Sequence, residues 1–266
     1  MHGIWKLDNP QTAEPLFAGW QETMICSCLQ GVMGEIYAVA ADNPSTACPR
    51  SAMAMLGDFC FLAGEPDAKL VSYKPEGCDR DFMIMVPQDS PQKESWAEII
   101  RQVYGEKARQ VTRYAIKKEE NIWDMAALRK AVGELSDGYV LREIDEEIYH
   151  RCMEAEWSRD LVAQYRNYEQ YRDWGSGVVI LHGQEIVSGA SSYSGYRGGI
   201  EVEIDTREDH RRKGLAYICG AGLILKCVSC GLYPSWDAQN LWSVALAEKL
   251  GYHFDHVYTA YEIWGY

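Results

Sequence analysis

The sequence lacks three features that would place it in a common class of protein. It has no excess of positive charge, because 26 lysines and arginines face 39 aspartates and glutamates and leave a formal net charge of −13; this excludes a nonspecific nucleic-acid binder and a simple binder of anionic membranes. No run reaches the roughly 18 apolar residues of a membrane span, and no basic segment followed by an apolar one opens the chain. No solenoid repeat or low-complexity tract is present. We therefore expect a globular protein of the cytoplasm.

The nine cysteines also lack the arrangement of a disulfide framework or a closed metal site. Their number is odd and no secretory signal precedes them, so we expect mostly reduced thiols. Two close pairs exist, Cys26 with Cys28 and Cys227 with Cys230. Neither has a second pair to complete the four ligands of a structural zinc ion. The sequence therefore predicts buried free thiols and no metal.

The length of 266 residues corresponds to roughly two domains at about 150 residues each. The first half predicts an N-terminal αβ domain over residues 1–135. Its expected strands cover residues 35–39, 58–62, 82–86 and 111–117, its expected helices cover residues 51–56, 95–104 and 124–135, and a turn is expected at residues 42–44. The turn cluster at residues 136–138 predicts the domain boundary.

The second half, residues 136–266, predicts another mixture of strands and helices. A strand over residues 139–144 leads into a helix over 146–153 that Asp145 caps. Further strands are expected at residues 178–181, 185–193, 200–206, 232–236 and 252–263, and further helices at residues 159–171, 215–228 and 240–250. The fold class is therefore α/β, with mixed sheets of the α+β kind.

A short basic cluster stands out in this acidic chain, at the point where a strand gives way to a helix. Alternation along the strand places Ile200, Val202 and Ile204 on one face and the acidic residues between and after them on the other. The cluster that follows comprises Arg207, His210, Arg211, Arg212 and Lys213. A helix beginning at Gly214 offers free N–H groups and a positive dipole end to an anion. The pattern favours a phosphate cradle, and a solvated run of charge is the alternative.

Two motifs carry a resemblance to a known family. Arg211-x-x-Gly214-x-Ala216, directly after a strand, resembles the acyl-CoA pyrophosphate loop of the GNAT N-acetyltransferase superfamily, whose pattern is Gln/Arg-x-x-Gly-x-Gly/Ala. Downstream, Asn240 opens a helix that ends Lys-Leu-Gly-Tyr at residues 249–252, which is similar to that superfamily's second hallmark. Two motifs in the right order are far more specific than either alone.

The resemblance spans about residues 139–263 and implies a C-terminal GNAT acyl-CoA N-acyltransferase fold. One interpretation of the N-terminal domain is a degenerate copy of the same fold. Because it contains no Arg-x-x-Gly-x-Gly/Ala segment, we expect it to bind no CoA. Its segment 57–64, Gly-Asp-Phe-Cys-Phe-Leu-Ala-Gly, gives the whole chain a resemblance to the zwittermicin A resistance branch of the superfamily.

The resemblance also implies where acetyl-CoA, the co-substrate, would lie. Its pantetheine arm would pair with backbone groups of Ile204, Asp205 and Thr206, where the strand parts from its neighbour. Its pyrophosphate would meet Arg211 and the backbone N–H groups of Arg212, Lys213, Gly214, Leu215 and Ala216. Asn240 and Ser243 would lie beside the pantetheine arm. A plain role as a helix N-cap is compatible with this contact for Asn240.

Acyl transfer to an amine needs a base, an oxyanion donor and an acid. Glu201 and Glu203 are the candidate bases, acting directly or through water. They share one face of the strand, and crowded carboxylates raise each other's pKa. The alternative is a sheet face paired with arginine or lysine. Ala247 occupies the position where many members carry a tyrosine acid. A structural role is the simpler interpretation for each nearby candidate: Tyr252, Tyr258, Tyr261, His253 and His256.

The leading interpretation is an N-acetyltransferase that moves an acetyl group from acetyl-CoA to a primary amine of a small molecule. The charge of −13 favours a cationic acceptor, such as an aminopolyol or an antibiotic-like amine. The resemblance to the zwittermicin A resistance branch points the same way and implies a role in antibiotic resistance. Two alternatives stay open: a non-catalytic acyl-CoA-binding regulatory module, indicated by Ala247, and a degenerate pair of domains that forms only a partner surface. The edge strands and nine tryptophans permit a homodimer without requiring one.

Overall fold

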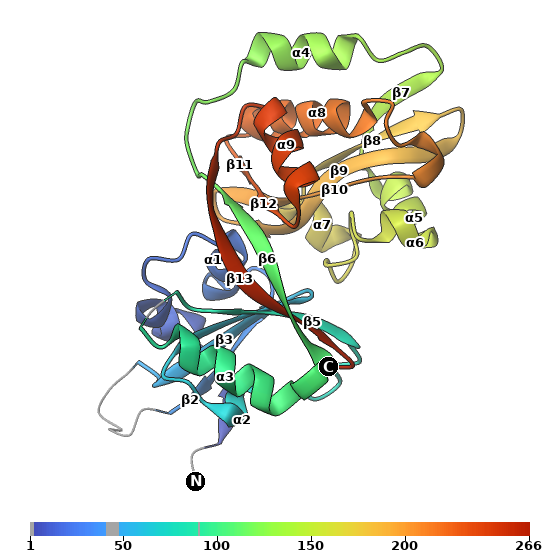
Figure 1. The fold of residues 1–266 in the computed structure, drawn as a ribbon. Coiled ribbons are helices and arrows are strands. Elements are labelled where there is room, and N and C mark those ends of the chain that lie inside the picture. The colour runs from blue at the N-terminus through green and yellow to red at the C-terminus, as the bar shows by residue number, and fades with distance from the viewer. Residues whose placement is uncertain (1–2, 41–47, 90) are drawn as a thin grey trace. The chain divides into compact units, whose positions relative to one another are not determined.

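The computed structural model of the protein describes residues 3–40, 48–89 and 91–266 (Figure 1). The chain forms two compact units: unit 1 comprises Met1–Arg113 and Val257–Tyr266, and unit 2 comprises Tyr114–His256. No helix among the described residues is both long and apolar enough to cross a bilayer. The turn predicted at residues 42–44 lies outside the described residues.

The units are not divided at the predicted boundary after residue 135. The helix expected to end the first domain, α4 (Met125–Gly133), belongs to unit 2. Its buried Leu128 shares a core cluster with Ile224 of α8 (Leu215–Ser229). The turn signals after α4 mark a loop, but an amphipathic helix joins the unit that buries its apolar side, and that partner is α8.

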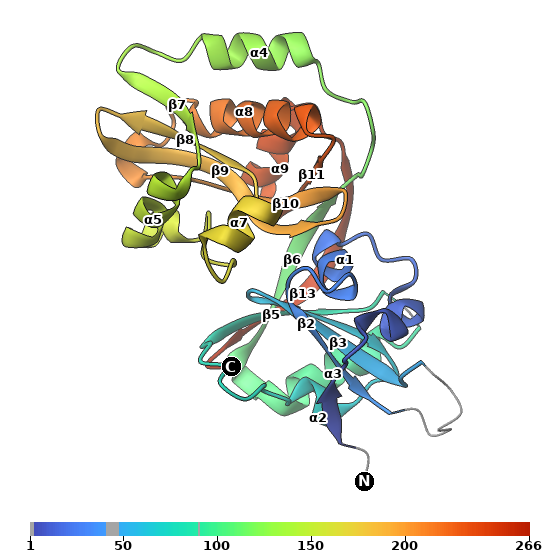
Figure 2. The same ribbon diagram turned by 180° about the vertical axis from the view of Figure 1, so that it is seen from behind.

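Unit 1 contains one mixed sheet whose strands lie in the order β1-β2-β3-β4-β5-β13-β6. The strands are β1 (Ile4–Lys6), β2 (Glu35–Val39), β3 (Ser51–Leu56), β4 (Phe59–Gly64), β5 (Phe82–Pro87), β6 (Ala108–Ile116) and β13 (Phe254–Trp264). Helix α3 (Lys93–Tyr104) and the short α2 (Ala68–Val71) pack on one face through Trp96 and Leu70. Helix α1 (Thr23–Leu29) covers the other face, as opposite views show (Figures 1 and 2).

The predicted helix over residues 51–56 is wrong, whereas the other elements predicted for this unit are confirmed to within a few residues. Residues 51–56 form β3, which pairs antiparallel with both β2 and β4. Their alanines and methionines favour helices in isolation. Every residue of β3 is buried between two strands, and this tertiary context overrides the local preference.

Unit 2 contains a second sheet in the order β11-β10-β9-β8-β7. The strands are β7 (Tyr139–Glu143), β8 (Gly177–His182), β9 (Glu185–Tyr196), β10 (Gly199–Thr206) and β11 (Tyr233–Ser235). Helix α8 packs on one face, where Cys219 and Leu223 meet Ile180 and Ile200. The opposite face carries α5 (Glu146–Glu154), α6 (Glu156–Arg159) and α7 (Tyr168–Trp174) (Figure 1). The two units together confirm a mixed α/β architecture.

The single helix predicted over residues 159–171 is wrong. Helix α6 ends at Arg159, and α7 begins only after Asn167, whose side chain accepts a hydrogen bond from the Gln170 amide at 3.0 Å. The chain between them turns Tyr165 into the core. By contrast, the predicted cap of α5 is confirmed, because Asp145 accepts from the Ile148 amide at 2.9 Å. The closing strands predicted over residues 252–263 are one strand, β13, which begins in unit 2 and ends in unit 1.

Candidate active site

Strands β10 and β11 diverge after a short stretch of pairing. β11 pairs in parallel with β10 only as far as Glu201, which lies opposite Ser235. Immediately afterwards β12 (Asp237–Ala238) pairs with β6 instead. β10 continues to Thr206 and pairs with β9 on its other side. We call the side of residues 202–206 that faces away from β9 the divergent edge.

Two backbone amides point to the divergent edge. The Asp205 carbonyl faces β9, where it accepts from Ser188 Oγ at 3.2 Å. Since successive residues of a strand direct their backbone groups to opposite sides, the backbone groups of Ile204 and Thr206 face the divergent edge. The Ile204 amide donates to Glu203 Oε1 at 3.2 Å, and the Thr206 amide donates to Asp205 Oδ1 at 2.6 Å. Of the three residues predicted to pair with pantetheine, Ile204 and Thr206 therefore offer donors at this edge, whereas the backbone of Asp205 faces β9.

The N-terminus of α8 follows directly after the basic loop. Gly214 is the N-cap residue with a φ of +80°, and no side chain of the described residues caps the helix. The first bond of the helix runs from the Ile218 amide to the Gly214 carbonyl at 3.2 Å, so the amides of Leu215 and Ala216 precede the first intrahelical donor. A Cβ atom at Gly214 would meet nothing within 4 Å. This helix end is therefore open to an anion.

The three basic side chains before Gly214 are exposed. Arg211 Nε donates to the Thr206 carbonyl at 3.0 Å, and its Nη2 lies 3.7 Å from Asp205 Oδ1. Arg212 has a φ of +62°, a conformation that costs a non-glycine residue about 1–3 kcal/mol. Burial raises the pKa of Asp205, while hydrogen bonding from Thr206 and the charge of Arg211 oppose that rise. The loop thus brings the end of β10 and the start of α8 together.

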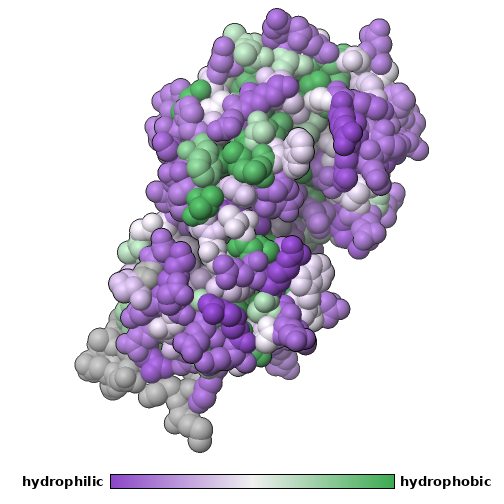
Figure 3. Space-filling view, viewed as in Figure 1, coloured by the Kyte–Doolittle hydropathy of each residue, from purple (hydrophilic) through white to green (hydrophobic). Residues whose placement is uncertain are grey.

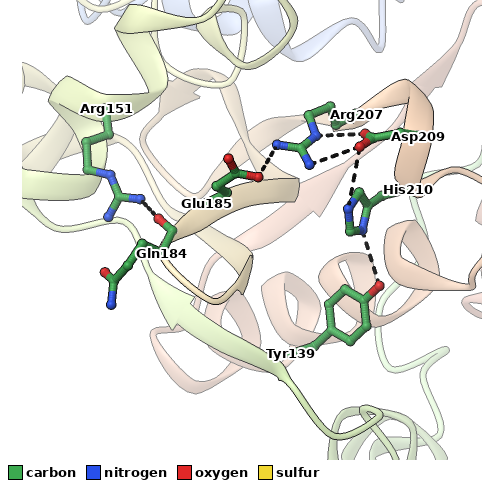
Figure 4. A network of polar contacts seen from close by, with 7 residues as sticks. All are labelled: Tyr139, Arg151, Gln184, Glu185, Arg207, Asp209 and His210. Carbon is green, nitrogen blue, oxygen red and sulfur yellow. Dashed lines mark hydrogen bonds and ion pairs between the residues drawn. The ribbon is translucent and has the colours of Figure 1, made fainter.

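A polar network holds the segment that precedes this loop (Figure 4). Arg207 binds Asp209 through two bonds of 2.7 and 3.0 Å and reaches Glu185 Oε2 at 2.9 Å. His210 Nε2 lies 3.8 Å from Asp209 Oδ2, and His210 Nδ1 lies 3.2 Å from the Tyr139 hydroxyl. The network therefore attaches the start of the loop to β7 through Tyr139 and to β9 through Glu185.

The same network has a defined charge state near neutral pH. Burial, followed by the charge of Lys213, lowers the pKa of His210, so its imidazole is neutral at pH 7. Beside it, Arg151 of α5 donates to the carbonyl of Gln184 in the β8–β9 turn (Figure 4). The sequence predicted the basic residues of this region, but it gave no signal that Tyr139 and Glu185 would support them, because these contacts join separate strands.

The two candidate bases, Glu201 and Glu203, are alternate residues of β10 and lie on the face of the sheet away from α8. Glu201 is buried, with 4% of its surface exposed, at the last position paired with β11. Glu203 is half-buried and accepts from the Ile204 amide. Alternation places both on the face of β10 opposite Ile200, which packs beneath α8. Glu201 therefore lies where the divergent edge begins, and Glu203 lies along that edge.

Asn240 and Ser243 lie at the start of α9 (Leu241–Lys249). The N-cap role of Asn240 is confirmed, because its Oδ1 accepts from the Ser243 amide at 2.9 Å. Ser243 Oγ accepts from Trp236 Nε1 at 3.0 Å. This bond, which the sequence did not indicate, links α9 to the residue directly after β11. It places both side chains close to the point where β11 leaves β10.

Ala247 is buried, and the nearby tyrosines and histidines that the sequence offers as acids each have a contact or a place in a core. The Tyr252 hydroxyl donates to the Pro234 carbonyl at 2.7 Å, and burial raises its pKa well above the usual value. Tyr258 accepts from Arg113 Nε at 3.2 Å, and Tyr261 is buried in the core of unit 1. His253 and His256 are exposed and lie 2.7 Å from Glu119 and 3.0 Å from Asp255, respectively.

The nine cysteines are free thiols, and Cys28, Cys60, Cys152, Cys219 and Cys227 are buried. Among residues 3–40, 48–89 and 91–266, no group of three or more histidine, cysteine, aspartate or glutamate side chains is arranged to hold a metal ion.

The surface of unit 2 carries an apolar area near α8 and α9 (Figure 3), and Leu241 and Trp242 are 66% and 87% exposed. Such areas often mark interfaces, and the homodimer stays a prediction.

Comparison with protein families gives one extensive match. The sequence profile of a family described as GNAT acetyltransferase matches residues 14–261. A curated relative, the uncharacterized N-acetyltransferase YdfB of Bacillus subtilis, is 30% identical over 171 residues. The aligned region covers 63% of this chain and 62% of the length of that relative.

Solved structures give matches over nearly the whole chain. A GCN5-related N-acetyltransferase-like protein from Streptococcus suis is 46% identical, with a TM-score of 0.85 over 96% of this chain and 98% of that one. A tandem GNAT protein from the clavulanic acid biosynthesis pathway is 11% identical, with a TM-score of 0.56 over 100% of this chain and 99% of that one. The second match shows a shared fold.

Proposed function

Since the chain belongs to the GNAT acetyltransferase family, we propose that it transfers an acetyl group from acetyl-CoA to a primary amine of a small, cationic molecule. The observation that carries this proposal is the divergent edge of β10, which ends at the uncapped N-terminus of α8. An extended arm that ends in a pyrophosphate needs amide donors along a strand edge and an anion site beyond them. The end of β10 and the start of α8 supply both in that order.

The residues present fit this ligand. Ile204 and Thr206 supply amides for the pantetheine arm, and the amides from Arg212 to Ala216 supply the anion site, with Arg211 beside them. Asn240 and Ser243 would flank the arm from α9. Bound acetyl-CoA supplies the acetyl group as an activated thioester. The amides of β10 have to exchange their bonds to Glu203 and Asp205 for bonds to the ligand.

Glu201 and Glu203 are the proposed bases for the ammonium of the acceptor. The ammonium must lose a proton before its nitrogen can attack a thioester carbonyl, and both carboxylates lie on one face of β10 near the divergence. Ala247 provides no acid. A thiol has a pKa near 8.5, so a thiolate is an acceptable leaving group close to neutral pH without one.

The acceptor is proposed to be an aminopolyol or an antibiotic-like amine, which would give the protein a role in resistance. The net charge of −13 attracts cations at the encounter stage. The resemblance of segment 57–64 to the zwittermicin A resistance branch supports the same class. The nine free thiols support a reducing compartment such as the cytoplasm.

Calorimetric titration with acetyl-CoA and with CoA, followed by a panel of primary amines, tests the proposal. We expect binding in the micromolar range, about −8 kcal/mol, and thiol release above the hydrolysis background with at least one cationic amine. No binding at millimolar ligand would contradict the proposal. Tight binding without turnover of any amine would favour the alternative function, a non-catalytic acyl-CoA-binding module. The one observation that supports this alternative is Ala247 at the position of the usual tyrosine acid.

One acetyl-CoA is expected to bind per chain, although both units resemble parts of a tandem GNAT fold. In unit 1 the parallel pair β4–β5 stays joined through Leu62 opposite Pro87, and the Gln88 amide extends it with a 2.9 Å bond to the Leu62 carbonyl. The helix that follows β4 is only four residues long, and Asp67 caps it by accepting from the Lys69 and Leu70 amides. A carboxylate therefore already occupies that helix end.

The stoichiometry of the calorimetric titration checks this expectation, and we expect about one acetyl-CoA per chain. Asp67→Asn is the matched control, because it removes the negative charge while keeping the capping oxygen; it should leave the stoichiometry at one. A second binding event in the wild-type protein would contradict the interpretation of unit 1 as a degenerate copy.

Arg207→Lys is expected to weaken acetyl-CoA binding about threefold to tenfold, on the order of 1 kcal/mol, with kcat unchanged. Lysine keeps the charge but cannot bind Asp209 through two parallel bonds while reaching Glu185, so the loop before Gly214 loses its support. Measured KM and kcat values check this. Arg172→Lys is the control, since Arg172 is an exposed partner of Asp173 in the same unit; an equal effect in both variants would refute the role of the network.

A further inference from the structure

A row of polar side chains crosses three strands where β10 and β11 diverge. Glu201 of β10 is paired in register with Ser194 of β9 on one side and with Ser235 of β11 on the other. Opposite residues on neighbouring strands have Cβ atoms about 5 Å apart. Both serines are 0% exposed. A buried carboxylate is therefore flanked on both sides by a buried hydroxyl.

Neither hydroxyl of this row has a hydrogen-bond partner among the residues that the structure describes. The other three serines of β9 differ, because each is bonded: Ser188 Oγ to Thr206 Oγ1 at 2.7 Å, Ser191 Oγ to Tyr171 Oη at 2.8 Å and Ser192 Oγ to Tyr165 Oη at 2.7 Å. A buried hydroxyl without a partner is unfavourable, because nothing replaces the hydrogen bonds that it makes to water in the unfolded chain. Such groups call for an explanation, for example a partner that joins them during function.

The row stands at the inner end of the divergent edge. The register between β9 and β10 shifts directly after Glu201, which marks a β-bulge, and β11 ends at Ser235. The next residue, Trp236, turns to the α9 side and binds Ser243. Alternation therefore directs Ser235 away from α9, to the face that carries Glu201.

We propose that Ser194 and Ser235 are positioning residues that hold, together with Glu201, the water through which the proton of the acceptor reaches the Glu201 carboxylate. The inference rests on the proposed acetyltransferase function. Because only 4% of the surface of Glu201 is exposed, a water molecule reaches its carboxylate more easily than the ammonium group of a substrate does. A buried water needs only two to four polar partners. Two hydroxyls and a carboxylate supply three.

The proton transfer balances without a further reactant. One N–H bond of the ammonium breaks as the water takes its proton, and the water gives another proton to a Glu201 oxygen. The products are a neutral amine, a carboxylic acid and the same water. The amine nitrogen is then free to attack the thioester.

A crystal structure of the wild-type protein at high resolution tests the water site independently of activity. We expect one ordered water within about 3.2 Å of both serine hydroxyls and a Glu201 oxygen, and its loss in Ser235→Ala. If the three side chains bond one another with no water between them, the inference is overturned, whether or not the protein proves to be an acetyltransferase. Failure of the proposed function would instead appear as absent turnover in the amine panel.

Kinetics of Ser194→Ala and Ser235→Ala provide the second test, with Ser51→Ala as the matched control. Ser51 is also fully buried without a partner, but it lies in β3 of unit 1. We expect kcat to fall about tenfold in Ser194→Ala and in Ser235→Ala, and the acid limb of the pH profile of kcat to move to higher pH by roughly half a unit. KM for acetyl-CoA should not rise, and the melting temperature should not fall. Unchanged kcat and pH profile in both row variants, or an equal loss in Ser51→Ala, would overturn the inference.

Discussion

Gly214→Glu is expected to abolish acetyl-CoA binding while leaving the protein folded. Gly214 precedes the first turn of α8 with a φ of +80°, and a side chain added there would project into open space. A carboxylate at this position would face the same amides that the pyrophosphate needs and would repel it. We expect Kd to rise by more than about 100-fold, which corresponds to about 2.7 kcal/mol.

Gly214→Ala separates the backbone effect from the charge. Alanine meets the same unfavourable φ, which costs about 1–2 kcal/mol, but it adds no charge. Both variants should therefore melt at similar, slightly lowered temperatures by circular dichroism, while alanine raises Kd by less than about tenfold in the calorimeter. Unchanged affinity in Gly214→Glu would refute the assignment of the α8 N-terminus as the pyrophosphate site.

Glu201→Gln is expected to lower kcat by about 100-fold or more and to leave the Kd for acetyl-CoA unchanged. The substitution keeps the shape of the side chain and its acceptor oxygen but removes the group that takes the proton. Glu201 is buried at the end of the β10–β11 pairing, next to the divergent edge proposed to hold the pantetheine arm. Steady-state kinetics with the best amine of the panel, combined with calorimetry, measures both quantities.

Glu203→Gln is the companion variant. Glu203 is only half-buried, and its Oε1 accepts the Ile204 amide at the divergent edge. That amide is a proposed donor to pantetheine, so we expect this variant to change KM for acetyl-CoA more than kcat. A larger loss of kcat in Glu203→Gln than in Glu201→Gln would show that the base is Glu203.

The sequence predicted the local elements around the candidate site because their signals are short-range. The alternation over residues 200–206, the basic loop and the long apolar helix after Gly214 each depend on neighbouring residues. All three are present as β10, the loop and α8. The cap by Asn240 follows from the same local chemistry.

Predictions failed where distant residues decide the outcome. Residues 51–56 form a strand because β2 and β4 bind them on both sides, and α4 joins unit 2 because Leu128 packs with Ile224. The direction of the Asp205 backbone also depends on pairing with β9, where Asp205 lies opposite Gly189 and its carbonyl accepts from Ser188 Oγ. The contact of Asp205 with pantetheine stays a prediction.

By itself the sequence determined the mixed α/β class, the pair of GNAT-like motifs and the acidic character of the chain, because composition, periodicity and caps are properties of adjacent residues. Only the tertiary structure decided that β11 leaves β10 after Ser235, that Glu201 is buried there between two serines, and that Tyr139 and Glu185 support the loop. Strand register and divergence arise from pairing between segments far apart in the chain. A single sequence carries no local signal for them.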